Sequence, residues 1–294
     1  MRSTSSRPGF LRRRALQGLT SLLLAVGLSA GGVLTAAPAS ADEIGQAPTP
    51  ANIIGNGSFG VASTGIGNPS GFGGGQAYYP TTPGTYPVIA VVPGYLSYWS
   101  SMSWIGPRLA SWGYVVVGIE TNTIYDQPAS RGSQLRSALN WAVNSSPSAV
   151  RSRVDANRQG VAGWSMGGGG SLEALKADTS GRIKAAVPIA PWNGDKSWPE
   201  VSEPVAIVGG QSDSVAPVGS HSIPFYNSLP GQKAYVELGG ADHFFVNRDN
   251  AHLSWMLVSW FKRYLNNDAR FTAYTCGFDD AGVPGVSSFR TNAC

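Results

Sequence analysis

Apolar and polar positions along this chain form two alternating patterns. Short continuous apolar runs, rich in β-branched residues, are typical of buried strands. They lie at residues 86–94, 114–121, 158–164, 183–192, 203–213 and 233–240. Longer segments between them have apolar residues at helical spacing or helix-forming composition. They lie at residues 101–113, 130–144, 167–178 and 251–268.

This alternation predicts an α/β fold. Continuous apolar strands that alternate with helices are typical of a mostly parallel central sheet covered by helices on both faces. The chain shows no internal repeat and no interdomain linker, and residues 42–75 are too rich in Gly, Pro, Ser and Asn for their elements to be predicted. The connection between the strands that end near Ala190 and begin near Pro204 is too short for a lid domain.

Residues 1–41 have the composition of a secretory signal peptide. Five arginines and no acid occupy residues 1–14, a glycine-interrupted apolar stretch follows, and residues 39–41 form an A-x-A cleavage site. A membrane anchor is the weaker alternative, because no second apolar run of spanning length follows. We therefore expect a secreted, extracellular domain at residues 42–294, whose export route stays open.

Removal of this segment changes the charge. Five of the 21 basic residues and none of the 17 acidic ones lie within it, so residues 42–294 carry a net charge of −1. The basic balance of the whole chain thus predicts no nucleic-acid or membrane partner.

In an exported protein Cys276 and Cys294 are expected to form a disulfide, with free thiols as the alternative. Two cysteines and three histidines do not favour a metal site.

A candidate nucleophile lies at the carboxyl end of one predicted strand. Ser165 is the centre of Gly163-Trp164-Ser165-Met166-Gly167, a G-x-S-x-G between a buried strand and a helix. Small residues permit a sharp, strained turn that exposes the hydroxyl, and the following amides begin a helix, where negative charge is favoured. A phosphate-binding loop is the alternative, but the Gly-Lys-Ser/Thr ending is missing.

A serine nucleophile needs a base, and the chain offers three histidines. His243 follows a predicted strand on a loop, in the chain order serine, acid, histidine. His252 lies within the closing helix, and His221 lies in a predicted early helical turn. Position therefore favours His243 as the general base.

The acid is expected on a loop between the serine and the histidine. Asp213 ends a predicted strand there and would orient the His243 ring. Asp242 is the rival, although adjacent side chains on a loop rarely converge on one hydrogen bond. Asp195 and Glu203, from the preceding connection, are weaker candidates.

Two backbone amides are candidates for an oxyanion hole. One is that of Met166, directly after the serine, and the other comes from the loop after the third strand of such folds, here at Tyr95. An ordinary surface aromatic is the alternative reading of Tyr95. This chemistry requires neither a metal nor an organic cofactor.

Several long segments resemble the bacterial cutinases and polyester hydrolases that include the PET-degrading enzymes. They are "VPGYLSYWSS", "GPRLASWGYVVVGIETNTIYDQPASRG", "GWSMGGGGSL", "APW", "SDSVAPV" and the C-terminal cysteine pair. The resemblance covers nearly the whole of residues 42–294 and implies an α/β-hydrolase fold. It also implies that Ser165, Asp213 and His243 form the triad, with Tyr95 and Met166 as the oxyanion pair.

The resemblance implies a substrate groove as well. Trp192 in "APWNGD" matches the family's mobile aromatic-binding tryptophan, and Val215 and Tyr95 would contact the same substrate. Trp99 stands where the family usually has a groove-lining glutamine, so this tryptophan would reshape the site. Such aromatic side chains suit an aryl or long-chain ester.

Other positions mix the features of two branches of the family. Trp164 is the PETase-like choice before the serine, whereas Phe244 and His221 are the ordinary cutinase choices. The single cysteine pair leaves no second disulfide at the active site. These differences bear on which polyester is preferred and leave the chemistry unchanged.

The sequence thus predicts a secreted, monomeric serine esterase that cleaves cutin-like polyester and PET through an acyl-enzyme. A lipase or carboxylesterase for soluble short-chain esters is the alternative within the enzymes. A non-catalytic binding protein on a hydrolase fold is the alternative from another class. It is disfavoured because the sequence retains all three triad residues and both oxyanion positions.

Overall fold

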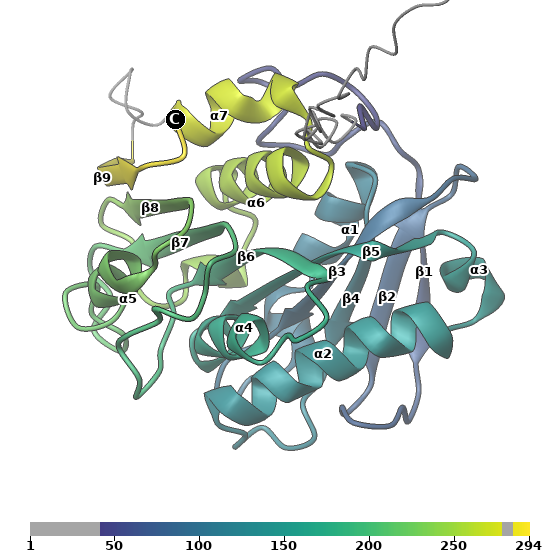
Figure 1. Cartoon of the computed structure of the whole chain (residues 1–294), viewed down its shortest axis with the longest axis horizontal. Helices are drawn as coiled ribbons and strands as arrows, with labels where there is room; N and C mark the ends of the chain where they lie inside the picture. Colours follow the sequence, from purple (N-terminus) through teal and green to yellow (C-terminus); the bar gives the residue numbers. More distant parts are fainter. Residues whose placement is uncertain (1–41, 278–284) are drawn as a thin grey trace, which may run out of the picture. The chain divides into compact units, whose positions relative to one another are not determined.

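A nine-stranded sheet forms the centre of the fold in a computed structural model that describes residues 42–277 and 285–294 (Figure 1). The predicted signal peptide, residues 1–41, lies outside the described residues. The strands are β1 (Val61–Ile66), β2 (Gly75–Pro80), β3 (Tyr86–Val92), β4 (Val115–Ile119), β5 (Val154–Trp164), β6 (Ile183–Ile189), β7 (Val205–Gly210), β8 (Lys233–Leu238) and β9 (Val286–Thr291).

Helices connect most of these strands. The α-helices are α1 (Ile105–Ser111), α2 (Pro128–Asn144), α3 (Ser148–Arg151), α4 (Met166–Lys176), α5 (Ser222–Ser228), α6 (Ala251–Leu265) and α7 (Thr272–Cys276). Short 3₁₀ turns are η1 (Trp99–Met102), η2 (Phe245–Asn247) and η3 (Ala269–Phe271). The segment expected to be helical at residues 101–113 is thus divided between η1 and the shorter α1.

The sheet is parallel in its middle and antiparallel at its two edges. Its order is β1-β2-β4-β3-β5-β6-β7-β8-β9, and every pair from β4 to β8 in that order is parallel. The pairs β1–β2, β2–β4 and β8–β9 are antiparallel. This arrangement agrees with the predicted mostly parallel sheet.

Two hydrophobic cores lie on the two faces of the sheet. Along β3, Ile89 and Val91 pack into one core with α1 and α6, whereas Val88 and Ala90 pack into the other with α2 and α4. Figure 1 shows these helix pairs on opposite sides of the sheet. Because successive strand side chains point to opposite faces, the continuous apolar runs of the sequence are the signature of a sheet buried on both sides.

The sequence pattern did not predict the edge strands β1 and β9, nor β2 and the short helices α3 and α7. β1 and β9 have mixed polar and apolar residues that are mostly half-buried or exposed, so neither has an apolar run to mark it. The connection between β6 and β7, residues 190–204, is described throughout and holds no helix or strand, in keeping with the predicted lack of a lid. Across the described ranges, every helix falls short of the length and apolar character that a membrane crossing requires.

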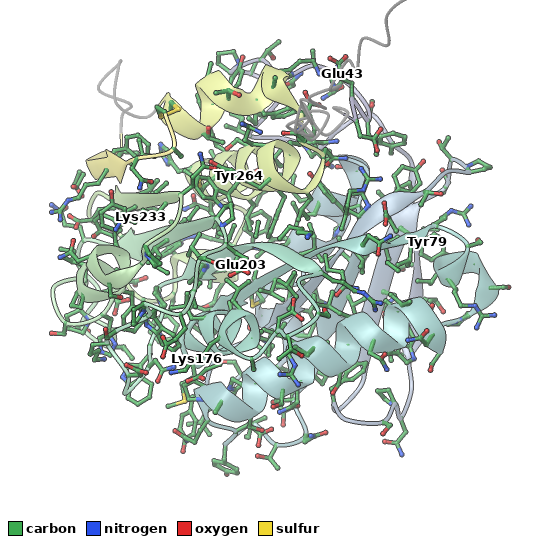
Figure 2. All side chains as sticks on the ribbon, in the orientation of Figure 1. Glu43, Tyr79, Lys176, Glu203, Lys233 and Tyr264 are labelled. Carbon is green, nitrogen blue, oxygen red and sulfur yellow. A yellow bond between two sulfur atoms is a disulfide. The ribbon has the colours of Figure 1, made fainter. Side chains whose placement is uncertain are left out.

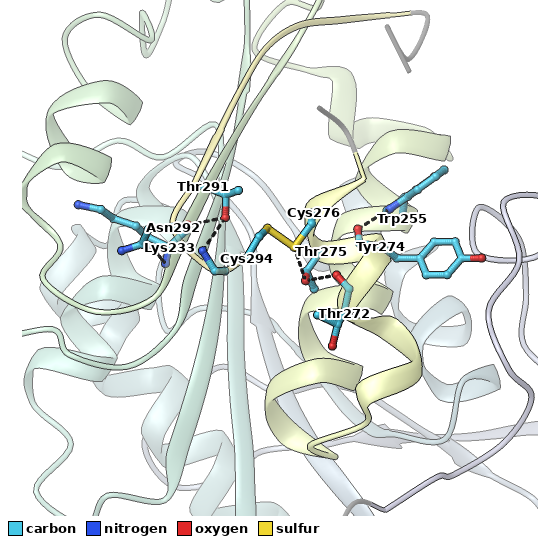
Figure 3. The surroundings of a disulfide bond; sticks show 10 residues. Lys233, Trp255, Thr272, Tyr274, Thr275, Cys276, Thr291, Asn292 and Cys294 are labelled. Atoms are coloured by element: carbon cyan, nitrogen blue, oxygen red, sulfur yellow. Dashed lines mark hydrogen bonds between the residues drawn. A yellow bond between two sulfur atoms is a disulfide. The ribbon is translucent and has the colours of Figure 1, made fainter. Parts of the chain in front are cut away.

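The predicted disulfide between Cys276 and Cys294 is present and joins α7 to the chain just after β9 (Figure 3). Beside it, the Lys233 amide donates to Asn292 Oδ1 at 2.7 Å, which extends the β8–β9 pairing. Lys176 lies on the exposed end of α4 (Figure 2). Its Nζ is 3.2 Å from Glu200 Oε1.

Candidate active site

Ser165 occupies a strained turn between β5 and α4. Its φ is 58° and its ψ is −121°, which places a residue with a side chain in a region that favours glycine. The backbone on the two sides of the turn is in close contact, because a Cβ at Gly163 would lie 2.3 Å from the Gly167 carbonyl oxygen. The glycines around Ser165 therefore let the backbone pass close to itself and present the hydroxyl at the carboxyl edge of the sheet.

The structure brings together the serine, the histidine and the aspartate that the sequence singled out. His243 Nε2 lies 2.9 Å from Ser165 Oγ, and His243 Nδ1 lies 2.7 Å from Asp213 Oδ2. All three residues are buried. Since an ionised carboxylate can only accept, Nδ1 carries the proton and Nε2 of the neutral ring is free to accept from the serine.

The Asp213 carboxylate is held in its charged form. Burial works against ionisation, but hydrogen bonds from His243 and from the amides of Ala216 and Val215 outweigh it, and the pKa of Asp213 lies below its ordinary value. The two amides donate to Oδ1 at 2.7 and 2.8 Å, respectively. One oxygen is thus fixed by backbone while the other faces the imidazole, an arrangement that can stabilise a positive charge on the ring.

Two backbone amides beside the serine, those of Tyr95 and Met166, make no hydrogen bond to the part of the chain that the structure describes. Met166 is the first residue of α4, and Gly94 packs so closely on the serine that a Cβ there would lie 2.9 Å from the Ser165 Cβ. Both amides therefore flank Ser165, where they could receive a negatively charged oxygen.

Trp192 is tied to the serine through the backbone. Its amide donates to the Ser165 carbonyl oxygen at 2.8 Å. Its half-buried ring packs against His221 at a centroid distance of 5.8 Å. His221 Nδ1 lies 2.7 Å from Lys196 Nζ, and burial together with the Lys196 charge lowers the pKa of His221 to about 4. His221 is therefore a neutral support for Trp192 at physiological pH.

Exposed apolar side chains surround the triad. Val215 is 50% exposed directly after the Asp213 turn, Phe244 is 52% exposed after His243, and Tyr95 is 41% exposed. Tyr125, which the sequence pattern did not single out, is 61% exposed, and its ring lies edge-on to that of Tyr95 at a centroid distance of 6.0 Å. Its signal was available, because Tyr125 lies beyond the carboxyl end of β4, the edge at which parallel sheets bind ligands.

Trp99 does not take the position expected from the resemblance. Its side chain is only 4% exposed and lies over Gly118 of β4, where a Cβ would be 2.1 Å from the indole ring. Its Nε1 points to the Tyr78 hydroxyl at 3.4 Å. The structure thus places Trp99 in the core, because a glycine on the adjacent strand leaves room to bury the large ring.

The alternative acid Asp242 and the alternative base His252 contact residues outside the triad. Asp242 Oδ1 accepts from the Phe244 amide at 2.9 Å, which folds the carboxylate back onto its own loop. His252 is near the start of α6 and packs beside Gly285. Trp164 supports the histidine loop, since its Nε1 donates to the His243 carbonyl oxygen at 2.9 Å.

The fold is that of an α/β hydrolase, and the serine, histidine and aspartate stand in the geometry that serine hydrolases use. A family model described as "PETase: PET hydrolase-like" matches residues 36–294. The chain therefore belongs to the PET hydrolase-like family, and it is a carboxylic ester hydrolase.

Named relatives are similar over most of their length. A bis(hydroxyethyl) terephthalate hydrolase of Streptomyces coelicolor is 44% identical over 289 residues, 93% of this chain and 92% of that protein. A cutinase of Thermobifida fusca is 44% identical, covering 96% of this chain and 95% of the relative. Cutinase 2 of Thermobifida cellulosilytica is 46% identical, covering 75% of this chain and 85% of the relative.

Proposed function

We propose that this protein is a secreted polyester hydrolase whose triad is Ser165, His243 and Asp213. The observation that carries the proposal is the continuous hydrogen-bonded line from Asp213 Oδ2 through the imidazole to Ser165 Oγ, with contacts of 2.7 and 2.9 Å. Family membership makes an ester carbonyl the group that this serine attacks.

In the first half of the reaction, Ser165 Oγ attacks the ester carbonyl carbon and its proton moves to His243 Nε2. The carbonyl oxygen becomes an oxyanion, which the Tyr95 and Met166 amides bind. The Asp213 carboxylate stabilises the imidazolium. The ester C–O bond then breaks, Nε2 returns the proton to the leaving alkoxide, and the acid part of the polymer stays on Ser165 as an acyl-enzyme.

Water completes the cycle by the same route. His243 Nε2 takes a proton from water as it attacks the acyl carbon, and a second oxyanion forms in the same position. Collapse of this intermediate returns the proton to Ser165 Oγ and releases a carboxylic acid. Every proton therefore passes through one imidazole nitrogen, which explains why His243 is held on both sides.

The surroundings of the triad suit a polymer with aromatic or long aliphatic units. Tyr95, Val215 and Phe244 are exposed beside the triad, and half-buried Trp192 bonds through its amide to the Ser165 carbonyl oxygen. Aromatic rings can pack on a terephthalate unit, and Val215 adds an apolar contact. Relatives named as a cutinase and as a bis(hydroxyethyl) terephthalate hydrolase support both kinds of acyl unit.

Product release from three substrates tests the proposal. Amorphous PET film, polycaprolactone film and soluble bis(hydroxyethyl) terephthalate are incubated with wild type and with Ser165→Ala. Wild type is expected to release acids from both films, and the alanine variant to lose roughly 10⁴-fold or more of this activity. Ser171→Ala is the matched control, because Ser171 is a nearby buried serine, within α4, whose hydroxyl donates to the Gly167 carbonyl oxygen at 3.1 Å.

Each pattern of release has its own meaning. Terephthalate products from film that disappear only in Ser165→Ala support the full proposal. Release from polycaprolactone alone supports the mechanism and identifies a cutinase. Hydrolysis of the soluble diester alone contradicts polymer hydrolysis and leaves an esterase for small substrates. Equal activity in wild type and Ser165→Ala would contradict the triad.

Export and oligomeric state complete the proposal. We expect cleavage after Ala41 and a monomer of residues 42–294 in the medium. Intact mass of the secreted protein tests the cleavage, and light scattering after gel filtration tests the monomer. A mass that retains the arginines of residues 1–14 would contradict the signal-peptide reading.

A further inference from the structure

Arg131 on α2 is a buried cation, and no carboxylate within residues 42–277 and 285–294 forms an ion pair with it. Its exposed fraction is 0%, and its nitrogens donate to three backbone carbonyls instead. Nε donates to Asp126 O at 2.8 Å, Nη1 to Pro93 O at 3.0 Å and Nη2 to Ile124 O at 3.0 Å. Burial lowers the pKa of Arg131 to about 10, against the opposing charge of Asp126, so the guanidinium stays charged at neutral pH. Burying a charged group costs desolvation free energy, so a function that requires this charge is expected.

The three carbonyls belong to two loops that leave the sheet beside the serine. Pro93 follows β3 and stands two residues before Tyr95, whereas Ile124 and Asp126 lie in the loop after β4. These two loops also meet directly, because the Leu96 amide donates to Ile124 O at 2.9 Å. Tyr95 is therefore held on both sides, by the guanidinium through Pro93 and by Leu96 through Ile124.

The other side of the first loop is packed just as tightly. A Cβ at Gly94 would lie 2.9 Å from the Ser165 Cβ, and a Cβ at Gly167 would lie 2.5 Å from the Pro93 carbonyl oxygen. The Pro93–Tyr95 segment is thus confined between the serine turn and the guanidinium. A displacement of about 1 Å in such a segment can cost roughly 100-fold in rate.

We propose that Arg131 is a positioning residue for the oxyanion hole, which sets the Tyr95 amide relative to Ser165 Oγ. This inference rests on the proposed function of that amide. A guanidinium is suited to the task, because its planar fork donates in several fixed directions at once. A lysine ammonium at the end of a flexible stem cannot hold carbonyls from both loops in the same geometry.

Arg108 provides a matched control. It is also a buried arginine, 6% exposed, and it donates to the Ile54 carbonyl oxygen at 2.6 Å and to Asp249 Oδ2 at 2.5 Å. Its partners lie outside the loops that flank Ser165. Loss of Arg108 should therefore cost stability without moving the Tyr95 amide.

The test compares Arg131→Met, Arg131→Lys and Arg108→Met with wild type. The thermal midpoint is measured first, and kcat and KM for p-nitrophenyl butyrate are measured well below the lowest midpoint. The inhibition constant of a butyl boronic acid is also measured, because its tetrahedral adduct on Ser165 reports oxyanion binding. For Arg131→Met we expect kcat to fall by about 100- to 1000-fold with KM nearly unchanged, and boronate binding to weaken by a similar factor. Arg131→Lys should fall between this variant and wild type.

A purely structural role predicts a different pattern. If the Arg131 variants are folded and keep wild-type kcat and boronate affinity while their midpoints fall as that of Arg108→Met does, the inference is wrong. Where Arg131→Met does not fold, Arg131→Lys decides, and a wild-type kcat in that variant overturns the inference. Failure of the proposed function gives a different result, because Ser165→Ala would then be as active as wild type.

Discussion

Two regions of this protein are stabilised in contrasting ways. The first is the site-bearing centre, formed by β3, β5, β6, β7 and the loops at their carboxyl ends. The second is the terminal layer, formed by residues 42–44, the end of α6, η3, α7 and β9. Every residue of β3 and β7 is buried, whereas no residue of β9 is fully buried. Both regions contribute apolar side chains to the cores, but the terminal layer adds long-range polar contacts and a disulfide.

The terminal layer joins parts of the chain that are far apart in sequence. The Asp42 amide donates to the Asn266 carbonyl oxygen at 2.9 Å, and the buried Lys262 Nζ donates to the Ile44 carbonyl oxygen at 2.6 Å. The disulfide then ties α7 to the chain beyond β9. Such links resist unfolding but do not contact the triad. Changes in the centre should therefore act on kcat, and changes in the terminal layer should act on stability.

The largest effect is expected at Asp213. Replacing it by asparagine removes the charge that selects the His243 tautomer and stabilises the imidazolium, so kcat for p-nitrophenyl butyrate should fall by about 10⁴-fold. Asp242→Asn is the control, since that carboxylate bonds to its own loop. A larger loss for Asp242→Asn than for Asp213→Asn would reverse the assignment of the acid.

A methyl group at Gly169 should also act in the centre. Its Cβ would lie 2.2 Å from the Trp192 carbonyl oxygen, so the segment that carries Trp192 must shift. We expect Gly169→Ala to lower kcat roughly 100-fold through misplacement and to cost about 1–3 kcal/mol of stability through overpacking. Gly194→Ala, whose Cβ meets nothing within 4 Å, should match wild type in both measurements.

Loss of the disulfide should separate stability from activity. Cys276 and Cys294 are 18 residues apart, and opening a loop of that size costs about 3 kcal/mol in the chain-entropy treatment. The double variant Cys276→Ser/Cys294→Ser should therefore unfold at lower urea concentration while its kcat at 25 °C stays within about twofold of wild type. A fall in kcat in the folded variant would mean that the terminal layer reaches the site.

The smallest effect is a pH dependence centred on Lys262. Burial lowers its pKa from 10.5 to about 7; Asp268 and Asp42 oppose this shift, and Arg270 and Arg158 add to it. Between these pH values the unfolded chain binds a proton that the folded chain does not, so the free energy of unfolding should rise with pH across this window. The penalty is present in full below pH 7.

Urea unfolding at pH 7, 8 and 9 measures this dependence. The slope with pH should be shallower in Lys262→Met than in wild type, whereas the exposed Lys184→Met should keep the wild-type slope. An identical slope in Lys262→Met and wild type would exclude Lys262 as the source.

The parallel centre of the fold could be predicted from sequence, and its antiparallel edges could not. β3 and β7 are continuous apolar runs, because both of their faces are covered. β1 and β2 pair antiparallel in a Gly-rich stretch that lacks such runs, and β9 is half-exposed. At an edge of the sheet, a segment becomes a strand because it pairs with the next strand. Its own pattern of apolar and polar residues does not show which strand that is.

The candidate site shows the same division. Ser165 lies in a local pattern of glycines between a strand and a helix, so it was visible in one short segment. The places of His243 and Asp213 followed from chain order and from the rule that loops at strand ends meet at one edge. The burial of Trp99 could not be predicted, because its ring packs over Gly118, a residue of a strand that is distant from Trp99 in the sequence.

Local spacing and long matching segments are enough to predict the alternation of strands and helices, the glycine turn at Ser165 and the family. Only the folded chain shows that Trp99 is buried, that Tyr125 contacts Tyr95, and that Arg131 links two loops. These are contacts between residues distant along the chain. Their geometry depends on how helices and strands pack, which no local period encodes.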